Sequence, residues 1–288
     1  MATDSTLYAP VAHPHHHHGW WWKTLLSGLA LWIVTIIVTA TTQNTNLVPT
    51  LILLGSFLVP FCVVLFVIER VTGSISTLQL VLAFFVGGIL GVLGASILEA
   101  RLQQSFGVYG LVGLIEEFVK GVLLVIVGWR VTPKTAKQGA LLGATIGAGF
   151  AAFESAGYAF NAAITSQGID LTSLLETEVV RAILAPVGHV LWTAILGAVI
   201  FGCAHLSDRF RWSWWIVIAY LGGSLLHAAW DSASEIAAFT AVATNGGAMQ
   251  FLTFYIFGLA LTSAAGILTL WLVLRHFGRT EALLQPAT

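Results

Sequence analysis

The chain has 288 residues, of which 57% are hydrophobic and only 9% are charged, and its mean hydropathy is +0.89. A soluble domain is about one quarter charged, so this composition argues against a soluble globular protein and indicates a polytopic helical membrane protein. The net charge of −1 gives no reason to expect a nucleic-acid partner. Cys62 and Cys203 stand singly in apolar runs, so neither a thiol redox motif nor a sulfur-rich zinc site is indicated.

Three regions are expected along the chain. Residues 1–23 are predicted to be a disordered, histidine-rich cytoplasmic tail, whose histidine run is open to two interpretations, adventitious metal binding or the remnant of a tag. Residues 24–275 are expected to form one transmembrane domain, with its core motifs within residues 108–240. Residues 276–288 are expected to form a second cytoplasmic tail.

Eight apolar runs are long enough to cross a bilayer as helices. In chain order they are 24–40, 47–68, 77–98, 108–129, 138–163, 178–203, 213–239 and 249–274. The ends expected to face one side carry most of the basic residues, namely Lys23, Arg70, Arg130, Lys134, Lys137, Arg209, Arg211, Arg275 and Arg279. The positive-inside rule places these ends and both termini in the cytoplasm. The sequence therefore predicts an all-α bundle of about eight transmembrane helices, multi-pass in the plasma membrane.

Glycines at close spacing occur in two of these runs. Gly87, Gly91 and Gly94 lie in the third run, and Gly143 and Gly147 lie in the fifth. Small residues at such spacings let helices approach closely in lipid, so we expect these glycines to serve helix packing.

Ionisable residues lie in the middle of the fourth run, at Glu116, Glu117 and Lys120. Each charged residue near the centre of a membrane helix costs roughly 2.5–3.5 kcal/mol on insertion scales. Such residues usually face a protein interior or a water-filled cavity and serve a function. Glu116 and Lys120 share a helix face, whereas Glu117 points about 100° away from Glu116. The two glutamates are therefore expected to have different roles, and their assignment is open at this point.

Three further runs bring ionisable residues to a similar depth. Glu154 lies in the fifth run, His189 in the sixth, and His227 and Asp231 in the seventh. Mutual pairing would offset the cost of these groups only if the four helices are neighbours, so a shared polar site is predicted. By contrast Arg181, near the end of a run, is expected to snorkel to water.

These residue types suit hydrolysis. A glutamate can take a proton from water, and histidines can orient that water or stabilise an oxyanion. Alternatively, His189 and His227 with either Glu154 or Asp231 would supply three ligands for a catalytic Zn²⁺ ion. The residues leave open whether the site uses zinc or a glutamate-activated water without metal.

The residues resemble the PrsW family of intramembrane proteases, which is related to the type II CaaX prenyl proteases and the Abi proteins. The matching motifs are Glu116-Glu117-x-x-Lys120, Phe150-x-x-x-Glu154, the segment around His189, and His227-x-x-x-Asp231. They follow the family order on successive spans and cover about residues 80–240.

The resemblance implies a bundle that hydrolyses peptide bonds in membrane-anchored proteins, such as an anti-sigma factor cleaved on the outer side. It makes six residues the catalytic candidates: Glu116, Glu117, Glu154, His189, His227 and Asp231. Lys120 and Phe150 would support them, with Lys120 holding a glutamate. The expected partners are a single-pass membrane protein substrate and the lipid bilayer.

Two other functions are compatible with the same residues. Carboxylates and histidines near the midplane also mark ion pathways, so a proton- or ion-coupled transporter is one alternative. A non-catalytic scaffold subunit that retains the bundle is the other.

Overall fold

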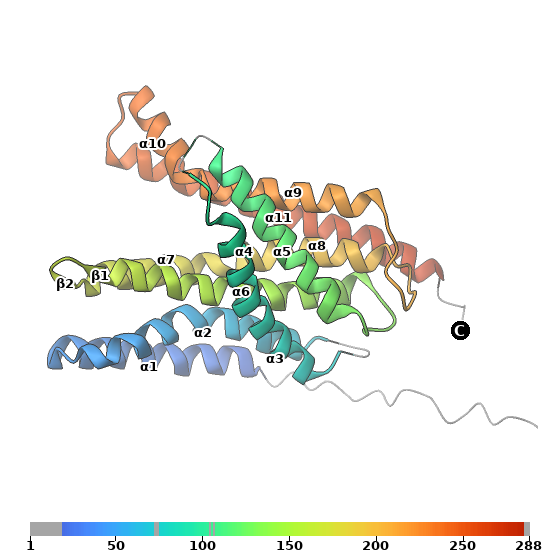
Figure 1. Ribbon diagram of the computed structural model, residues 1–288, viewed down its shortest axis with the longest axis horizontal. Helices are drawn as coiled ribbons and strands as arrows, with labels where there is room; N and C mark the ends of the chain where they lie inside the picture. The colour runs from blue at the N-terminus through green and yellow to red at the C-terminus, as the bar shows by residue number, and fades with distance from the viewer. Residues whose placement is uncertain (1–18, 72–74, 104, 106, 285–288) are drawn as a thin grey trace, which may run out of the picture.

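The computed structural model describes residues 19–71, 75–103, 105 and 107–284, which form a bundle of α-helices (Figure 1). Within the described residues, six helical segments are long and apolar enough to cross a membrane. They are Trp20–Thr42, Thr45–Ile68, Thr77–Glu99, Ala136–Ala163, Leu171–Gly202 and Ala248–Leu284. The predicted all-α polytopic membrane protein is therefore confirmed.

The elements follow the predicted apolar runs closely. In chain order they are α1 (Trp20–Thr42), η2 (Thr45–Leu47), α2 (Val48–Ile68), α3 (Thr77–Phe85), η3 (Val86–Leu90), α4 (Gly91–Glu99), α5 (Val108–Gly128), α6 (Ala136–Ala163), β1 (Ile164–Thr165), β2 (Gly168–Ile169), α7 (Leu171–Leu184), η4 (Ala185–Val187), α8 (His189–Gly202), α9 (Trp214–Asp231), α10 (Ala233–Ala243) and α11 (Ala248–Leu284). The strands β1 and β2 form only a short antiparallel hairpin between α6 and α7.

Two helices that the sequence predicts as spans, α5 and α9, lie outside this set of six. They are 21 and 18 residues long. α5 carries three charged residues, Glu116, Glu117 and Lys120, and α9 carries His227 and Asp231. The total of eight spans stays a prediction.

Three of the predicted runs are not single α-helices in the structure. The run 77–98 contains the π-helical segment η3 between α3 and α4, and two other runs are interrupted. The run 178–203 is divided between α7 and α8, because Pro186 lacks the backbone N–H that a continuous helix needs. His189 is consequently the first residue of α8. The run 213–239 is divided between α9 and α10, and α9 ends at Asp231. Both interruptions lie beside candidate site residues.

The centre of the bundle is the closely packed pair of α6 and α8. Gly139, Gly143 and Gly147 lie on successive turns of α6, and a Cβ atom on any of them would overlap a backbone carbonyl of α8. At Gly147 that carbonyl belongs to His189. The predicted packing role of Gly143 and Gly147 is confirmed, and this packing holds the backbone of His189 against α6.

The helix ends that adjoin the basic loops lie together at one end of the bundle, which we call the basic end (Figure 1). The first turn of α1 and the last turn of α11 lie there, whereas the β1–β2 hairpin and α10 lie at the opposite end. α1 begins at Trp20 and α11 continues to Leu284, so described parts of both predicted tails are helical. The remaining parts, residues 1–18 with the histidine run and residues 285–288, lie outside the described residues.

Candidate active site

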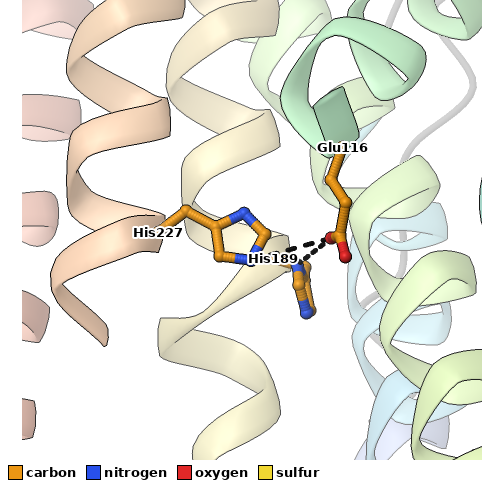
Figure 2. Close-up of side chains that lie close together, drawn as sticks. All are labelled: Glu116, His189 and His227. Carbon is orange, nitrogen blue, oxygen red and sulfur yellow. Dashed lines mark ion pairs between the residues drawn. The ribbon is translucent and has the colours of Figure 1, made fainter. Parts of the chain in front are cut away.

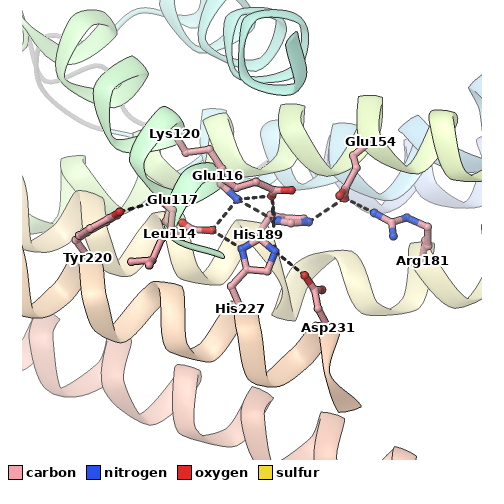
Figure 3. Close-up of polar contacts among 10 residues, drawn as sticks. All are labelled: Leu114, Glu116, Glu117, Lys120, Glu154, Arg181, His189, Tyr220, His227 and Asp231. Carbon is pink, nitrogen blue, oxygen red and sulfur yellow. Dashed lines mark hydrogen bonds and ion pairs between the residues drawn. The ribbon is translucent and has the colours of Figure 1, made fainter. Parts of the chain in front are cut away.

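The charged residues of α5 are buried in the bundle, with Glu116, Glu117 and Lys120 exposing 4%, 1% and 0% of their surface. Gly113 allows this, because it brings α5 so close to α9 that a Cβ atom there would lie 2.6 Å from the Ser224 carbonyl oxygen. Lys120 Nζ lies 2.6 Å from Glu117 Oε1 and 3.4 Å from Glu116 Oε2 (Figure 3). The ammonium therefore pairs more closely with Glu117, and Glu116 is the freer carboxylate.

His227, on α9, lies against both glutamates of α5. Its Nδ1 is 3.1 Å from Glu117 Oε1, and its Nε2 is 3.6 Å from Glu116 Oε2. One turn along α9, Asp231 Oδ2 lies 3.2 Å from the same Nε2. The imidazole also stacks on Trp192 of α8, with ring centroids 4.5 Å apart. Contacts from three helices thus fix both the position and the plane of this ring.

His189 links α8 to α5 and α6. Its Nδ1 lies 2.9 Å from Lys120 Nζ, and its Nε2 lies 2.9 Å from Glu154 Oε2. An ammonium group only donates hydrogen bonds, so Nδ1 must accept, and Nε2 carries the proton that is donated to Glu154. The lone pair of Nδ1 is consequently turned toward the α5 glutamates, 3.8 Å from Glu116 Oε2.

Arg181 joins the site from α7, which corrects the prediction that it snorkels to water. Its guanidinium forms an ion pair with Glu154, and its Nε donates to Ser155 Oγ at 2.7 Å. It also lies over the Tyr158 ring, 4.3 Å from the centroid. The position of an arginine in an apolar run, eight residues before His189, was the sequence feature that could have indicated a role in the site. Its partner could not be predicted, because the partner depends on how α7 packs against α6.

Phe150 supports the site by packing. The side chain is 1% exposed, Lys120 Nζ lies 4.3 Å from its ring centroid, and the His189 ring centroid is 5.0 Å away. Phe150 precedes Glu154 by one helical turn, and its ring packs against both the ammonium and the imidazole, which are in direct contact with each other. Its predicted role as a supporting residue stays a prediction.

A cavity of about 610 Å³, which we call the catalytic cavity, opens beside these groups. Its lining comes from α4, α5, α6, α7, α9, α10 and α11, and includes the carboxylates Glu99, Glu116, Glu154 and Asp231. An adjoining cavity of about 130 Å³ shares Glu154 and Asp231 and also reaches His189. Glu117 lines neither of these two cavities and stands behind Glu116.

The structure brings all six predicted catalytic candidates into one connected group (Figure 3). At its centre Glu116, His189 and His227 each offer one ligand atom, and the three atoms lie within 4.8 Å of one another (Figure 2). The sequence offered either Glu154 or Asp231 as the carboxylate ligand of a metal, beside the two histidines. In the structure each of these carboxylates contacts one of the histidines, and their role as ligands stays a prediction.

The donor set at the centre fits a divalent metal ion. Ligand atoms about 2.0–2.1 Å from a tetrahedral metal lie about 3.4 Å from each other, close to the 3.6 Å and 3.8 Å that separate Glu116 Oε2 from the two imidazole nitrogens. Metal-bound histidines usually donate their other N–H to a carboxylate, as His227 is placed to do with Glu117 and His189 with Glu154. When Nδ1 of His227 carries the proton, the lone pair of Nε2 faces the carboxylates of Glu116 and Asp231. A second proton or a cation at Nε2 would remove this unfavourable contact. The geometry is therefore compatible with a metal site.

Comparison with known protein families agrees with this geometry. The family model described as PrsW family intramembrane metalloprotease matches residues 16–262, well over half of the chain. No similar chain was found among curated proteins or among proteins of known structure. The match includes every residue of the buried polar group, by which we mean the six catalytic candidates with Lys120 and Arg181, and the chain therefore belongs to the PrsW family of intramembrane metalloproteases, enzymes that hydrolyse peptide bonds.

Proposed function

We propose that this protein is an endopeptidase of the plasma membrane that cleaves a single-pass, membrane-anchored protein, of the anti-sigma-factor kind, in the outer half of the bilayer. The observation that carries the proposal is the position of Glu116, which lines the catalytic cavity and lies within 4 Å of a nitrogen of both His189 and His227. The outer half is supported by the charge pattern, because the catalytic cavity includes Tyr109, the second residue of α5, far from the basic end.

In the form of the reaction that uses no metal, Glu116 is the proposed general base. It takes a proton from the water that attacks the scissile carbonyl carbon, and it returns that proton to the amine as the C–N bond breaks. Glu117 does not face the catalytic cavity, and its bonds to Lys120 and His227 make it a positioning residue. This assignment separates the roles of the two adjacent glutamates.

The histidines are proposed to orient the water and to stabilise the oxyanion that forms on the carbonyl. His227 is held by Glu117 and Asp231, and His189 by Glu154, so neither ring needs to reorganise during the reaction. Arg181 keeps Glu154 in place through their ion pair.

The alternative form of the reaction uses a metal, and in it Glu116 is a ligand and not the general base. Zinc is the expected metal, because imidazole and carboxylate ligands with one open position are typical of catalytic zinc sites. Glu116, His189 and His227 would hold it, and it would supply Lewis-acid activation of water and carbonyl. Lys120 would then leave His189 Nδ1 and keep its 2.6 Å contact with Glu117. With Glu116 engaged as a ligand, Asp231 is the carboxylate of the catalytic cavity placed beside His227 to accept the proton.

The experiment is a comparison of membrane proteomes from cells that carry the wild type, Glu116→Gln or the control Glu176→Gln. Glu176 is exposed on α7 and lines neither of the two site cavities. A single-pass protein that accumulates uncut only with Glu116→Gln supports the proposal and identifies the substrate. Full cleavage by reconstituted Glu116→Gln protein, expressed at the wild-type level, would refute the role of Glu116.

A further inference from the structure

Glu99 is a carboxylate of the catalytic cavity that the reaction outlined above does not use. It is the last residue of α4 and lines the same cavity as Glu116. Its Oε1 is buried and has no hydrogen-bond partner among the residues that the structure describes. Glu99 therefore differs from the residues of the buried polar group, each of which contacts at least one other member.

The other three carboxylates of the cavity wall each have a basic neighbour. Glu116 Oε2 lies 3.4 Å from an ammonium nitrogen, Asp231 Oδ2 lies 3.2 Å from an imidazole nitrogen, and Glu154 pairs with a guanidinium. Within the described part of the chain, the carboxylate of Glu99 forms no ion pair of this kind. Among the described residues, the wall thus presents one carboxylate that no basic side chain contacts directly.

The position of Glu99 makes this charge unfavourable for the free protein. A buried polar atom without a partner destabilises the fold, and native structures contain few of them. The C-terminal end of a helix also carries the negative end of the helix dipole, which disfavours a carboxylate. Glu99 thus lowers the stability of the protein without substrate, and it lines the cavity that a substrate would enter. A partner supplied by the substrate would explain why a carboxylate is present at this position.

Aromatic rings lie on the same cavity wall. Tyr109, Trp230 and Tyr255 line the cavity with Glu99, and the Tyr109 hydroxyl already donates to Glu235 Oε1 at 3.0 Å. Carboxylate oxygens accept charge-assisted hydrogen bonds from ammonium and guanidinium groups, and aromatic faces attract the same cations. The combination of one unpaired carboxylate and several aromatic rings suits a basic side chain.

We propose that Glu99 is a specificity residue that selects substrates carrying a lysine or arginine next to the cleaved bond. Its carboxylate pairs with that side chain while the adjoining peptide bond lies at Glu116. The inference rests on the proposed function, because it requires that a peptide enter the catalytic cavity. Glu99 is not placed in the chemical step itself.

The test uses the full-length protein in liposomes and a set of tagged single-pass reporters. Each reporter carries Lys, Gln or Glu at one position across the cleaved region, and mass spectrometry measures kcat/KM for each cleavage. The wild type should favour Lys over Glu by about tenfold at one position, because an unlike pair replaces a like-charge contact. Glu99→Gln should lose this preference while still cleaving the Gln reporter, and Glu99→Lys should reverse it. The matched control, Glu176→Lys, makes the same charge change outside the cavity and should keep the wild-type preference.

The proposal is overturned if the wild type shows no charge preference at any position, or if Glu99→Lys keeps the wild-type preference. It is also overturned if Glu99→Gln slows the cleavage of Lys, Gln and Glu reporters equally, because Glu99 would then act in turnover. Failure of the proposed function gives a different result, since the wild type would then cleave none of the reporters, or Glu116→Gln would cleave them as well as the wild type.

Discussion

Lys120 Nζ and Glu117 Oε1 lie 2.6 Å apart, and both side chains are buried. The two residues are one helical turn apart on α5, directly behind Glu116. Their opposite charges therefore determine the electrostatic surroundings of Glu116. Burying a charge inside a membrane bundle costs free energy, and the opposite charge of each partner offsets part of the cost of the other.

Removing the ammonium should therefore destabilise the protein. Lys120→Met leaves Glu117 and Glu116 buried next to each other without a cation, and we expect a loss of about 3–5 kcal/mol. Thermal unfolding in detergent micelles measures this loss. The double variant Lys120→Met/Glu117→Gln removes the uncompensated charge as well and should recover part of the stability. Equal stability of Lys120→Met and the wild type would contradict the pairing.

The two adjacent glutamates should respond differently to the same substitution. Glu116→Gln removes the proposed base and should lower kcat by about 10²–10⁴-fold with little change in the unfolding temperature. Glu117→Gln weakens the contacts that hold Lys120 and His227, and should lower both stability and activity. Cleavage kinetics and thermal unfolding on the same preparations distinguish the two effects. An unstable Glu116→Gln protein beside a stable but inactive Glu117→Gln protein would reverse our assignment.

The ion pair of Arg181 and Glu154 should act as a unit. Arg181→Gln removes the partner of Glu154, which in turn orients His189, so we expect a lower kcat. If Arg181 works only through Glu154, the double variant Arg181→Gln/Glu154→Gln should be no less active than Glu154→Gln alone. Additive losses would show that the guanidinium also acts through another contact, such as Ser155 or the substrate.

Bound metal can be counted directly. The full-length protein with the histidines of residues 13–18 replaced by serine should purify with about one zinc per chain, and His189→Ala or His227→Ala should lose it. Glu154→Gln should weaken zinc binding by about 10–100-fold, because Glu154 orients the imidazole of His189. Fully active protein without zinc would favour the mechanism in which Glu116 alone activates the water.

The packing of α6 on α8 provides a test of the fold. Gly143→Ala places a methyl group against the Thr193 carbonyl and should destabilise the protein by about 1–3 kcal/mol. Gly157→Ala is the matched control in the same helix, because a Cβ atom there meets nothing within 4 Å. It should be neutral or stabilising by about 0.5–1 kcal/mol. Similar unfolding temperatures for the two variants would argue against the close contact of α6 and α8.

The sequence by itself determined the class of protein and most of the residues of the site. Hydropathy depends on the local run of side chains, so the membrane helices and their approximate ends followed from composition and length. The cost of charges in lipid marked Glu116, Glu117, Glu154 and Asp231 as residues that need partners, and the motif spacing added the histidines.

Only the tertiary structure decided which partner each residue takes. The rotation of α5 pairs Lys120 with Glu117 more closely than with Glu116. The break at Pro186 places His189 at the start of α8, and the packing of α7 brings Arg181 to Glu154. These pairings depend on helix rotation, helix breaks and distances between segments far apart in the chain, which hydropathy and spacing do not encode.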